Sequence, residues 1–339
     1  MHHGRRLALL AGLGLLLGCA SPTEAQYVQP QTIAALRVTP RGGGLDSLII
    51  PGFHSERPGI LPPELETFTG RHAMLFEVAA PDGNAPLTIP ASPRPLDPAT
   101  HMTAGEYRFL RAMLTCIGMP PPVAGVHAAY YYSATLVFLR SRRRADGSWG
   151  CAALDAVSPP VPQRGARRSL APASGGDAWL RAMAYNHGVP VQGLQTPQEF
   201  LQGLLAIPED TLLRFVAKAA RETLADDGSG ATERAALDLV ATVLDGDFDE
   251  VRRQAILGLA DGDADRAILA RHLLDDRNRA FADHLAPRLR NERLVIAMGA
   301  AHAGEPNGIG HFLRERGFDV VPVRIRTANL IRRELRPAP

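Results

Sequence analysis

Two histidines follow directly after apolar stretches that end in small or turn-forming residues. His54 comes after the run SLII at 47–50, and His302 comes after the run LVIAM at 294–298. If both runs are parallel strands, each imidazole lies beyond the carboxyl end of a strand, where open α/β sheets bind their ligands. The two histidines are therefore candidates for one shared site.

A carboxylate, Glu77, lies in a third apolar stretch, AMLFEV at 73–78. A buried glutamate needs a partner, which can be an arginine, a metal ion or a proton retained through a raised pKa. Two imidazoles and one carboxylate suit a divalent transition metal that keeps an open position for water. The spacing alone leaves open that these histidines are ordinary hydrogen-bond partners in loops, because the chain has 11 of them.

Short apolar runs indicate the elements that would position these residues. Runs at 34–39 and 45–51 are separated by the glycine-rich sequence RGGG, which predicts a β-hairpin. Near the C-terminus, a strand at 294–299, a helix at 308–316 and a strand at 320–325 have the spacing of a crossover unit. Such a unit predicts a partly parallel sheet.

Two helices are predicted before the middle of the chain. Thr103 and Glu106 have the spacing of a capping box, which predicts a helix through about Cys116. A second helix is predicted over 123–139. Residues 141–175 are rich in arginine, proline, serine and glycine, and this composition is typical of a linker.

The second half of the chain is dominated by helical spacing. A helix at 177–187 and a short strand at 189–194 come first, and the apolar spacing from 197 to 290 is helical almost throughout. This periodicity is interrupted at 226–230 and 261–263. The predicted fold class is α/β, with a mixed, partly parallel sheet and a large helical insertion at about 197–290.

The N-terminus has the order of an export signal. Basic residues precede the apolar stretch 7–20, which is shorter than the roughly 20 residues that span a bilayer. Two endings remain open: LLGC at 16–19 resembles a lipobox that would place a lipid on Cys19, and TEA at 23–25 fits ordinary cleavage. We predict that residues 1–25 direct export to the periplasm or lipid anchoring at the cell envelope; a buried N-terminal helix is the alternative.

Composition and cysteine content agree with a folded, exported protein. The 339 residues are 45% hydrophobic, and their net charge of +2 lacks the basic excess that favours nucleic-acid binding. If Cys19 is lipidated or removed, Cys116 and Cys151 remain, and we predict a disulfide between them; two separate thiols are the alternative. Residues 26–339 are predicted to form a single domain.

The C-terminal third resembles the TraB/GumN family, which also includes the Tiki proteases. The resemblance is carried by Asp276-Arg277-Asn278, the stretch Ala297 to His302, Gly304-Glu305, Gly308, Phe312-Leu313 and Arg316 to Val320. Upstream, matching positions are Pro51 to His54, Glu77, Leu194 to Pro197 and Asp245-Gly246-Asp247. The resemblance thus covers roughly residues 33 to 326.

The chain departs from the family pattern at three places. Pro51 stands where the first GxxH motif has its glycine, and Gln195 stands where the family has a glutamate. The glycine after His302 comes one residue early, at Gly304. Because an amide cannot act as a base, the resemblance implies no acid or base role at position 195.

The resemblance implies a metal-dependent hydrolase of the peptidase type that uses a divalent cation such as manganese or cobalt. The implied metal ligands are His54, Glu77 and His302. Glu77 and Arg277 would take part in catalysis, and the substrate would contact Arg277, Asn278, Gly299 and Glu305. Arg277 would pair with a buried carboxylate such as Glu77 or with an anionic substrate group; an ordinary solvated helix surface is the alternative for Arg277 and Asn278.

Two other functions remain open from the sequence. The altered first motif and Gln195 favour a non-catalytic binding or regulatory protein, and the resemblance implies a peptide or a glycan as its ligand. A structural anchor would explain the N-terminal signal but not the histidines after the strands. A serine hydrolase, an HExxH metalloprotease and a Walker-type nucleotide-binding protein are disfavoured because their motifs do not occur.

Overall fold

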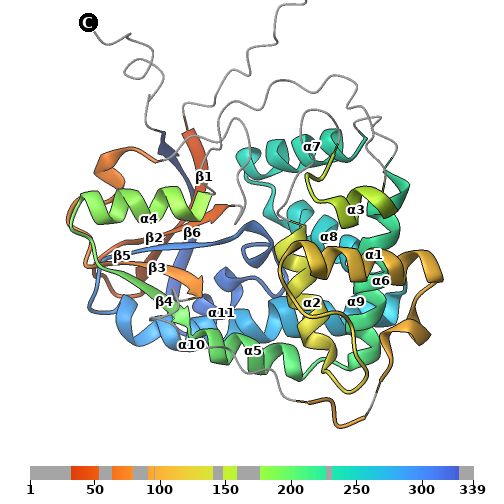
Figure 1. Ribbon diagram of the computed structural model, residues 1–339. Coiled ribbons are helices and arrows are strands. Elements are labelled where there is room, and N and C mark those ends of the chain that lie inside the picture. The colour runs from red at the N-terminus through yellow and green to blue at the C-terminus, as the bar shows by residue number, and fades with distance from the viewer. Residues whose placement is uncertain are drawn as a thin grey trace, which may run out of the picture.

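Six strands form one mixed sheet in the order β4-β3-β5-β2-β1-β6 (Figure 1). The computed structural model describes residues 32–52, 63–78, 91–94, 96–139, 148–158, 176–226 and 231–327. The strands are β1 (Thr32–Pro40), β2 (Ser47–Gly52), β3 (Ala73–Val78), β4 (Val191–Gln195), β5 (Leu294–Gly299) and β6 (Phe318–Arg326). Only β1 runs against the other described strands, so the sheet is largely parallel in direction.

The predicted hairpin and the predicted crossover are both present. β1 and β2 pair antiparallel, and Gly42, Gly43 and Gly44 in the turn have φ values of 93°, 97° and 148°, which favour glycine. β5 continues through α11 (Ile309–Glu315) to β6. β5 and β6 run in the same direction but are separated by β2 and β1, so the crossover passes over two strands.

Helices cover both faces of the sheet, which explains why the inner strands β2, β3 and β5 are almost continuously buried. On one face, Ile49, Leu75 and Ile296 pack with residues of α8 (Phe248–Leu259), α10 (Asp276–Leu289) and α11. On the other face, Ile50 and Val295 pack with residues of α4 (Gly176–Asn186) and α7 (Ala231–Asp245). The sheet is therefore the middle layer of this half of the molecule.

The remaining helices lie beside the sheet (Figure 1). They are α1 (Ala104–Cys116), α2 (Ala128–Phe138), α3 (Ala152–Val157), α5 (Pro197–Leu205), α6 (Glu209–Ala225) and α9 (Asp263–Ala270). Their apolar side chains form a separate cluster. The predicted disulfide is present and joins Cys116 at the end of α1 to Cys151 just before α3. None of the helices within the described residues combines the length and apolar character that crossing a bilayer requires.

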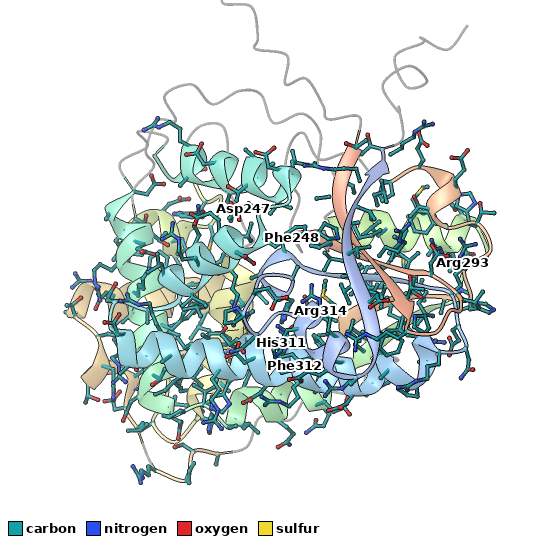
Figure 2. All side chains as sticks on the ribbon, turned by 180° about the vertical axis from the view of Figure 1, so that it is seen from behind. Asp247, Phe248, Arg293, His311, Phe312 and Arg314 are labelled. Atoms are coloured by element: carbon teal, nitrogen blue, oxygen red, sulfur yellow. A yellow bond between two sulfur atoms is a disulfide. The ribbon has the colours of Figure 1, made fainter. Side chains whose placement is uncertain are left out.

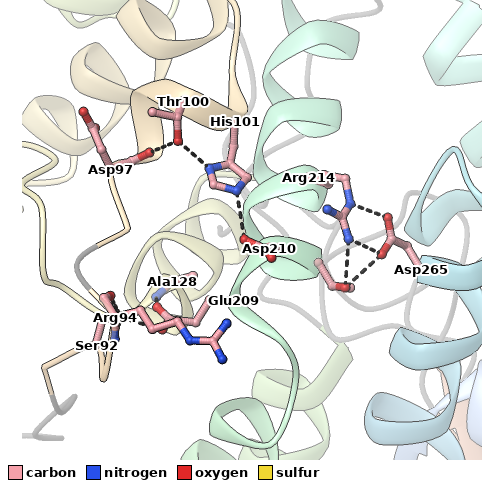
Figure 3. Close-up of polar contacts among 11 residues, drawn as sticks. Ser92, Arg94, Asp97, Thr100, His101, Ala128, Glu209, Asp210, Arg214 and Asp265 are labelled. Atoms are coloured by element: carbon pink, nitrogen blue, oxygen red, sulfur yellow. Dashed lines mark hydrogen bonds and ion pairs between the residues drawn. The ribbon is translucent and has the colours of Figure 1, made fainter.

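Two acidic residues at the start of α6, Glu209 and Asp210, connect the segment that follows residue 91 to the helical cluster (Figure 3). Glu209 accepts hydrogen bonds from Ser92 Oγ at 2.5 Å and from the backbone N–H of Ala128 at 2.8 Å. Asp210 Oδ1 lies 2.9 Å from His101 Nε2. Carboxylates are favoured at a helix N-terminus by the helix dipole, so these contacts stabilise both the helix and the segment.

Two local predictions were wrong, each for an identifiable reason. The helix predicted from 123 begins at Ala128 because His127 caps it, with Nδ1 accepting a hydrogen bond from the Ala129 N–H at 3.1 Å. Part of the predicted linker forms the short helix α3, which the disulfide at Cys151 attaches to α1. Tertiary contacts, which composition does not reveal, stabilise this short helix.

Candidate functional site

The carboxyl ends of four parallel strands meet at one edge of the sheet. Gly52 of β2 pairs with Gly299 of β5, and Val78 of β3 pairs with Gln195 of β4. Glu77 is the residue before Val78, on the same side of β3 as Leu75, and therefore points toward α10. The edge at which a ligand was expected thus carries several polar side chains.

Glu77 is buried and pairs with Arg277, which lies at the start of α10. Glu77 Oε2 is 2.6 Å from Arg277 Nη2, and the two side chains are only 6% and 15% exposed. Glu77 Oε1 accepts a hydrogen bond from the backbone N–H of Gly299 at 2.5 Å. Of the alternatives that the sequence left open for Arg277, the structure shows the pairing with a buried carboxylate.

His302 completes a cluster of three charged or titratable side chains with Glu77 and Arg277. It ends the short 3₁₀ turn η4 (Ala300–His302) that directly follows β5, and it is 3% exposed. His302 Nε2 lies 3.4 Å from Glu77 Oε2 and 3.4 Å from Arg277 Nη1. The strand-end histidine and the strand glutamate, far apart in sequence, thus meet at one point.

Asn278 holds the other nitrogen of the His302 ring. Its Oδ1 lies 2.7 Å from His302 Nδ1, and its Nδ2 donates a hydrogen bond to the backbone carbonyl of Asn307 at 2.7 Å. Asn278 is fully buried. Its side chain therefore contacts protein groups on both sides of the amide rather than solvent.

The start of α10 is shaped by a wider helical turn. A π-helical turn, η3 (Arg271–Asp275), joins α9 to α10, and the Asp276 N–H bonds to the carbonyl of Arg271. Such turns are frequent at functional sites. The next two residues, Arg277 and Asn278, are the ones that reach Glu77 and His302.

Aromatic rings and an amide surround the guanidinium of Arg277. The rings of Phe200 and Phe281 lie 5.4 Å and 5.1 Å from it, within the range of cation–π attraction. Arg277 Nε donates to Gln195 Oε1 at 3.4 Å, while Gln195 Nε2 is buried without a hydrogen-bond partner among the described residues. Burial raises the pKa of nearby Tyr132, and the charge of Arg277 opposes that rise.

Of the other residues implied by the resemblance, Gly299 belongs to the cluster through its N–H, and Glu305 does not. Glu305 pairs instead with Arg314 at 2.6 Å. Both line a separate cavity of about 230 Å³ together with Asp247 and Phe248. Arg314, Asp247 and Phe248 are labelled in Figure 2. His54 lies outside the described residues, as do Cys19 and the predicted export signal.

Glu77 and His302 fit two positions of a transition-metal site. An imidazole nitrogen and a carboxylate oxygen 3.4 Å apart can both bind one ion at ~2.0–2.2 Å. A metal-bound histidine usually donates its other N–H to a protein acceptor, as His302 Nδ1 can to Asn278. Among the described residues no group of three histidine, cysteine or acidic side chains could hold an ion, so a third ligand such as His54 stays a prediction.

Residues that the sequence did not single out extend this site. Asn307 supplies the carbonyl for Asn278, and its own Nδ2 donates to Asp275 Oδ2 at 3.1 Å. Arg252 on α8 pairs with the other oxygen of Asp275. The adjacency of Asp275 to the sequence Asp276-Arg277-Asn278 was the only available signal.

A family model matches the part of the chain that contributes three of these residues. The model of the TraB/PrgY/gumN family matches residues 153–322, just over half of the chain, and this range contains Arg277, Asn278 and His302. No match to the chain was found among curated proteins or among solved structures. The chain therefore belongs to the TraB/PrgY/gumN family.

Proposed function

We propose that this protein is a hydrolase of the peptidase type, dependent on a divalent cation such as manganese or cobalt held by Glu77 and His302. The observation that carries the proposal is the distance of 3.4 Å between Glu77 Oε2 and His302 Nε2 at the ends of two parallel strands. The acceptor on His302 Nδ1 adds support, because in a neutral ring it places the proton on Nδ1 and leaves the Nε2 lone pair on the side of Glu77. His54 is proposed as a further ligand.

Each side chain of the cluster would contribute through its present contacts. When bound, the cation would polarise a substrate carbonyl or lower the pKa of a water molecule. Glu77 would supply an oxygen ligand, and its two oxygens are held in place by the Gly299 N–H and by Arg277. Arg277 also carries the positive charge that would stabilise negative charge developing on the substrate.

Arg277 limits how the site can work. Its guanidinium already contacts both Glu77 Oε2 and His302 Nε2, so a cation at that position must share or take over these acceptors. Arg277 also has Gln195 and the Leu273 carbonyl as neighbours, at 3.4 Å and 3.3 Å. A small rotation of Arg277 toward these groups and toward a substrate oxyanion is therefore part of the proposal.

A second candidate function is the binding of a peptide or glycan without turnover. The observation that favours it is Gln195, which gives the end of β4 a neutral amide in place of a carboxylate. Its buried Nε2 has no hydrogen-bond partner among the described residues and can donate to a ligand carbonyl or hydroxyl. A neutral residue here supports recognition rather than proton transfer.

A cleavage assay separates the two functions. The full-length protein is incubated with a peptide library after chelation and after re-addition of Mn²⁺ or Co²⁺, beside the variants His302→Ala and His311→Ala. His311 is a half-buried histidine on α11, paired with Glu315, and serves as the matched control. Hydrolysis should require the added cation and His302 but not His311. Binding of peptides with no cleavage under any condition would favour the second function and contradict the first.

Export is also proposed, because residues 1–20 have a charged-then-apolar order and because Cys116 and Cys151 form a disulfide. Mass spectrometry of the mature N-terminus from fractionated cells tests this. A lipid on Cys19 or a start at Gln26 is expected. An intact N-terminus in the cytosolic fraction would contradict export.

A further inference from the structure

We infer that Asp275 is a positioning residue for His302. Through Asn307 and Asn278 it fixes the ring proton of neutral His302 on Nδ1, so that Nε2 is the unprotonated nitrogen facing Glu77 and Arg277. The inference concerns the position of one proton and stands whether or not the site binds a cation. Its consequence for metal affinity rests on the proposed function.

The orientation of the Asn278 amide is determined by the Asn307 carbonyl. A carbonyl oxygen only accepts hydrogen bonds, so the group 2.7 Å from it must be the Nδ2 donor of Asn278. The amide oxygen is then the group 2.7 Å from His302 Nδ1. Since that oxygen can only accept, Nδ1 carries the proton, and in the neutral ring Nε2 does not.

Asp275 holds the residue that supplies this carbonyl. Asp275 Oδ2 accepts a hydrogen bond from Asn307 Nδ2 at 3.1 Å, and Asp275 Oδ1 pairs with Arg252. Asp275 and Asn278 are three residues apart and thus project from neighbouring positions of one helical surface. Asn307 therefore contacts one helical segment twice. Its side chain donates to Asp275, and its backbone carbonyl orients the amide of Asn278.

Close packing fixes the loop that carries Asn307. A Cβ added at Gly304 would lie 2.3 Å from the Phe248 carbonyl oxygen and 2.7 Å from Arg252 Cβ, so the loop lies directly on α8. A Cβ at Gly308 would lie 2.5 Å from the Gly304 carbonyl oxygen. Gly304 and Gly308 are thus fixed on either side of Asn307. The hydrogen bond from Asn307 to Asp275 then sets the position of the Asn307 carbonyl.

Stability alone gives a poor explanation for the Arg252–Asp275 pair. The Arg252 side chain is 5% exposed and that of Asp275 is 21% exposed. Buried ion pairs often contribute no more than apolar residues of the same volume would, because both charges lose their hydration. Arg252 Nη1 is also buried without a hydrogen-bond partner among the described residues. A role in positioning Asn307 accounts for the retention of both charges.

The test is the protonation of the His302 ring in the full-length protein without metal, measured by nitrogen NMR after ¹⁵N-histidine labelling. The His302 signals are identified by their loss in His302→Gln. Wild type should show a proton on Nδ1 and none on Nε2. Asp275→Ala should give a measurable population with the proton on Nε2. Asp276→Ala, which removes the adjacent acid with surface partners, should match wild type.

A wild-type ring with its proton on Nε2, or with both nitrogens protonated, would overturn the inference even if Asp275→Ala did not fold. A folded Asp275→Ala protein with unchanged His302 signals would also overturn it. As a second readout, Mn²⁺ affinity should fall about 10–100-fold in Asp275→Ala, but not in Asp276→Ala. If the expected ring protonation is found but no cation binds to wild type, the proposed function fails and the role of Asp275 stands.

Discussion

Glu77 and Arg277 are 200 residues apart in the chain, yet their side chains form an ion pair of 2.6 Å at the edge of the sheet. The pair joins β3 to α10, and the N–H of Gly299 joins the same carboxylate to β5. One buried carboxylate thus connects β3 to two elements near the C-terminus, α10 and β5. Loss of the Glu77 carboxylate would therefore remove a contact to both α10 and β5.

Glu77→Gln should lower the free energy of unfolding by about 3 kcal/mol, because it leaves the guanidinium of Arg277 buried without a counter-charge. Chemical denaturation at pH 7 measures this loss. Glu315→Gln is the matched control, since Glu315 is an exposed carboxylate on α11 and surface ion pairs contribute little. Equal stability losses in the two variants would show that the Glu77–Arg277 pair is not a buried contact.

Gly304→Ala should destabilise the protein by about 2–3 kcal/mol, because the new methyl group meets the backbone of α8 at 2.3 Å. Gly258→Ala, within α8 and with no atom near its added Cβ, should instead stabilise by about 0.5 kcal/mol. Thermal unfolding of both variants provides the comparison. A wild-type melting temperature for Gly304→Ala would mean that the loop does not lie against α8.

The Cys116–Cys151 disulfide should contribute about 3–4 kcal/mol, as expected for a closed loop with a sequence separation of 35. The variant Cys116→Ser/Cys151→Ser should therefore unfold at lower denaturant concentration, and a reducing agent should have the same effect on wild type. The reducing agent should not affect the double variant further. Identical denaturation curves with and without reductant in wild type would contradict the structural role of this bond.

Asp265 should account for part of the loss of folding stability at low pH. Hydrogen bonds from Arg214 lower its pKa below 3.8, with burial opposing them and Thr211 adding to them (Figure 3). A carboxyl group whose pKa is lower in the folded than in the unfolded protein stabilises the fold. This stabilisation is complete at a pH above the unfolded-state pKa, and it is lost as the pH falls through the folded-state pKa.

Asp265→Asn should thus cost about 1 kcal/mol at pH 7, with a difference from wild type that disappears as the pH falls below 3.8. Denaturant unfolding at a series of pH values measures it. Asp263 lies on the same helix, and its side chain is almost fully exposed. Asp263→Asn should therefore change the stability less than Asp265→Asn does. A stability difference for Asp265→Asn that does not depend on pH would contradict the charge-based explanation.

The strands and the position of the site were predictable because their signals are local. Apolar runs flanked by turn residues located β1, β2, β3 and β5, and parallel strands place their carboxyl ends together. That reasoning brings Glu77 and His302 to one edge without knowledge of the helices. For Arg277, the sequence left several partners open, and Glu77 was one of them.

The contacts behind His302 were not predictable. Which residues of α10 face β5 depends on the π-helical turn Arg271–Asp275, and no local pattern of residues indicates such a turn. The link from Asp275 to Asn307 depends on how a loop packs against α8, which is a tertiary property. Sequence spacing therefore indicated which strand-end side chains lie together, but not which residues contact the other side of the His302 ring.

The central claim, that Glu77 and His302 hold one divalent cation, is tested most directly by calorimetric titration of the metal-free full-length protein with Mn²⁺ and Co²⁺. Wild type and His311→Ala should bind close to one equivalent of one of these ions, and His302→Ala should lose that binding. Unchanged binding in folded His302→Ala, or no binding by wild type, would contradict the claim.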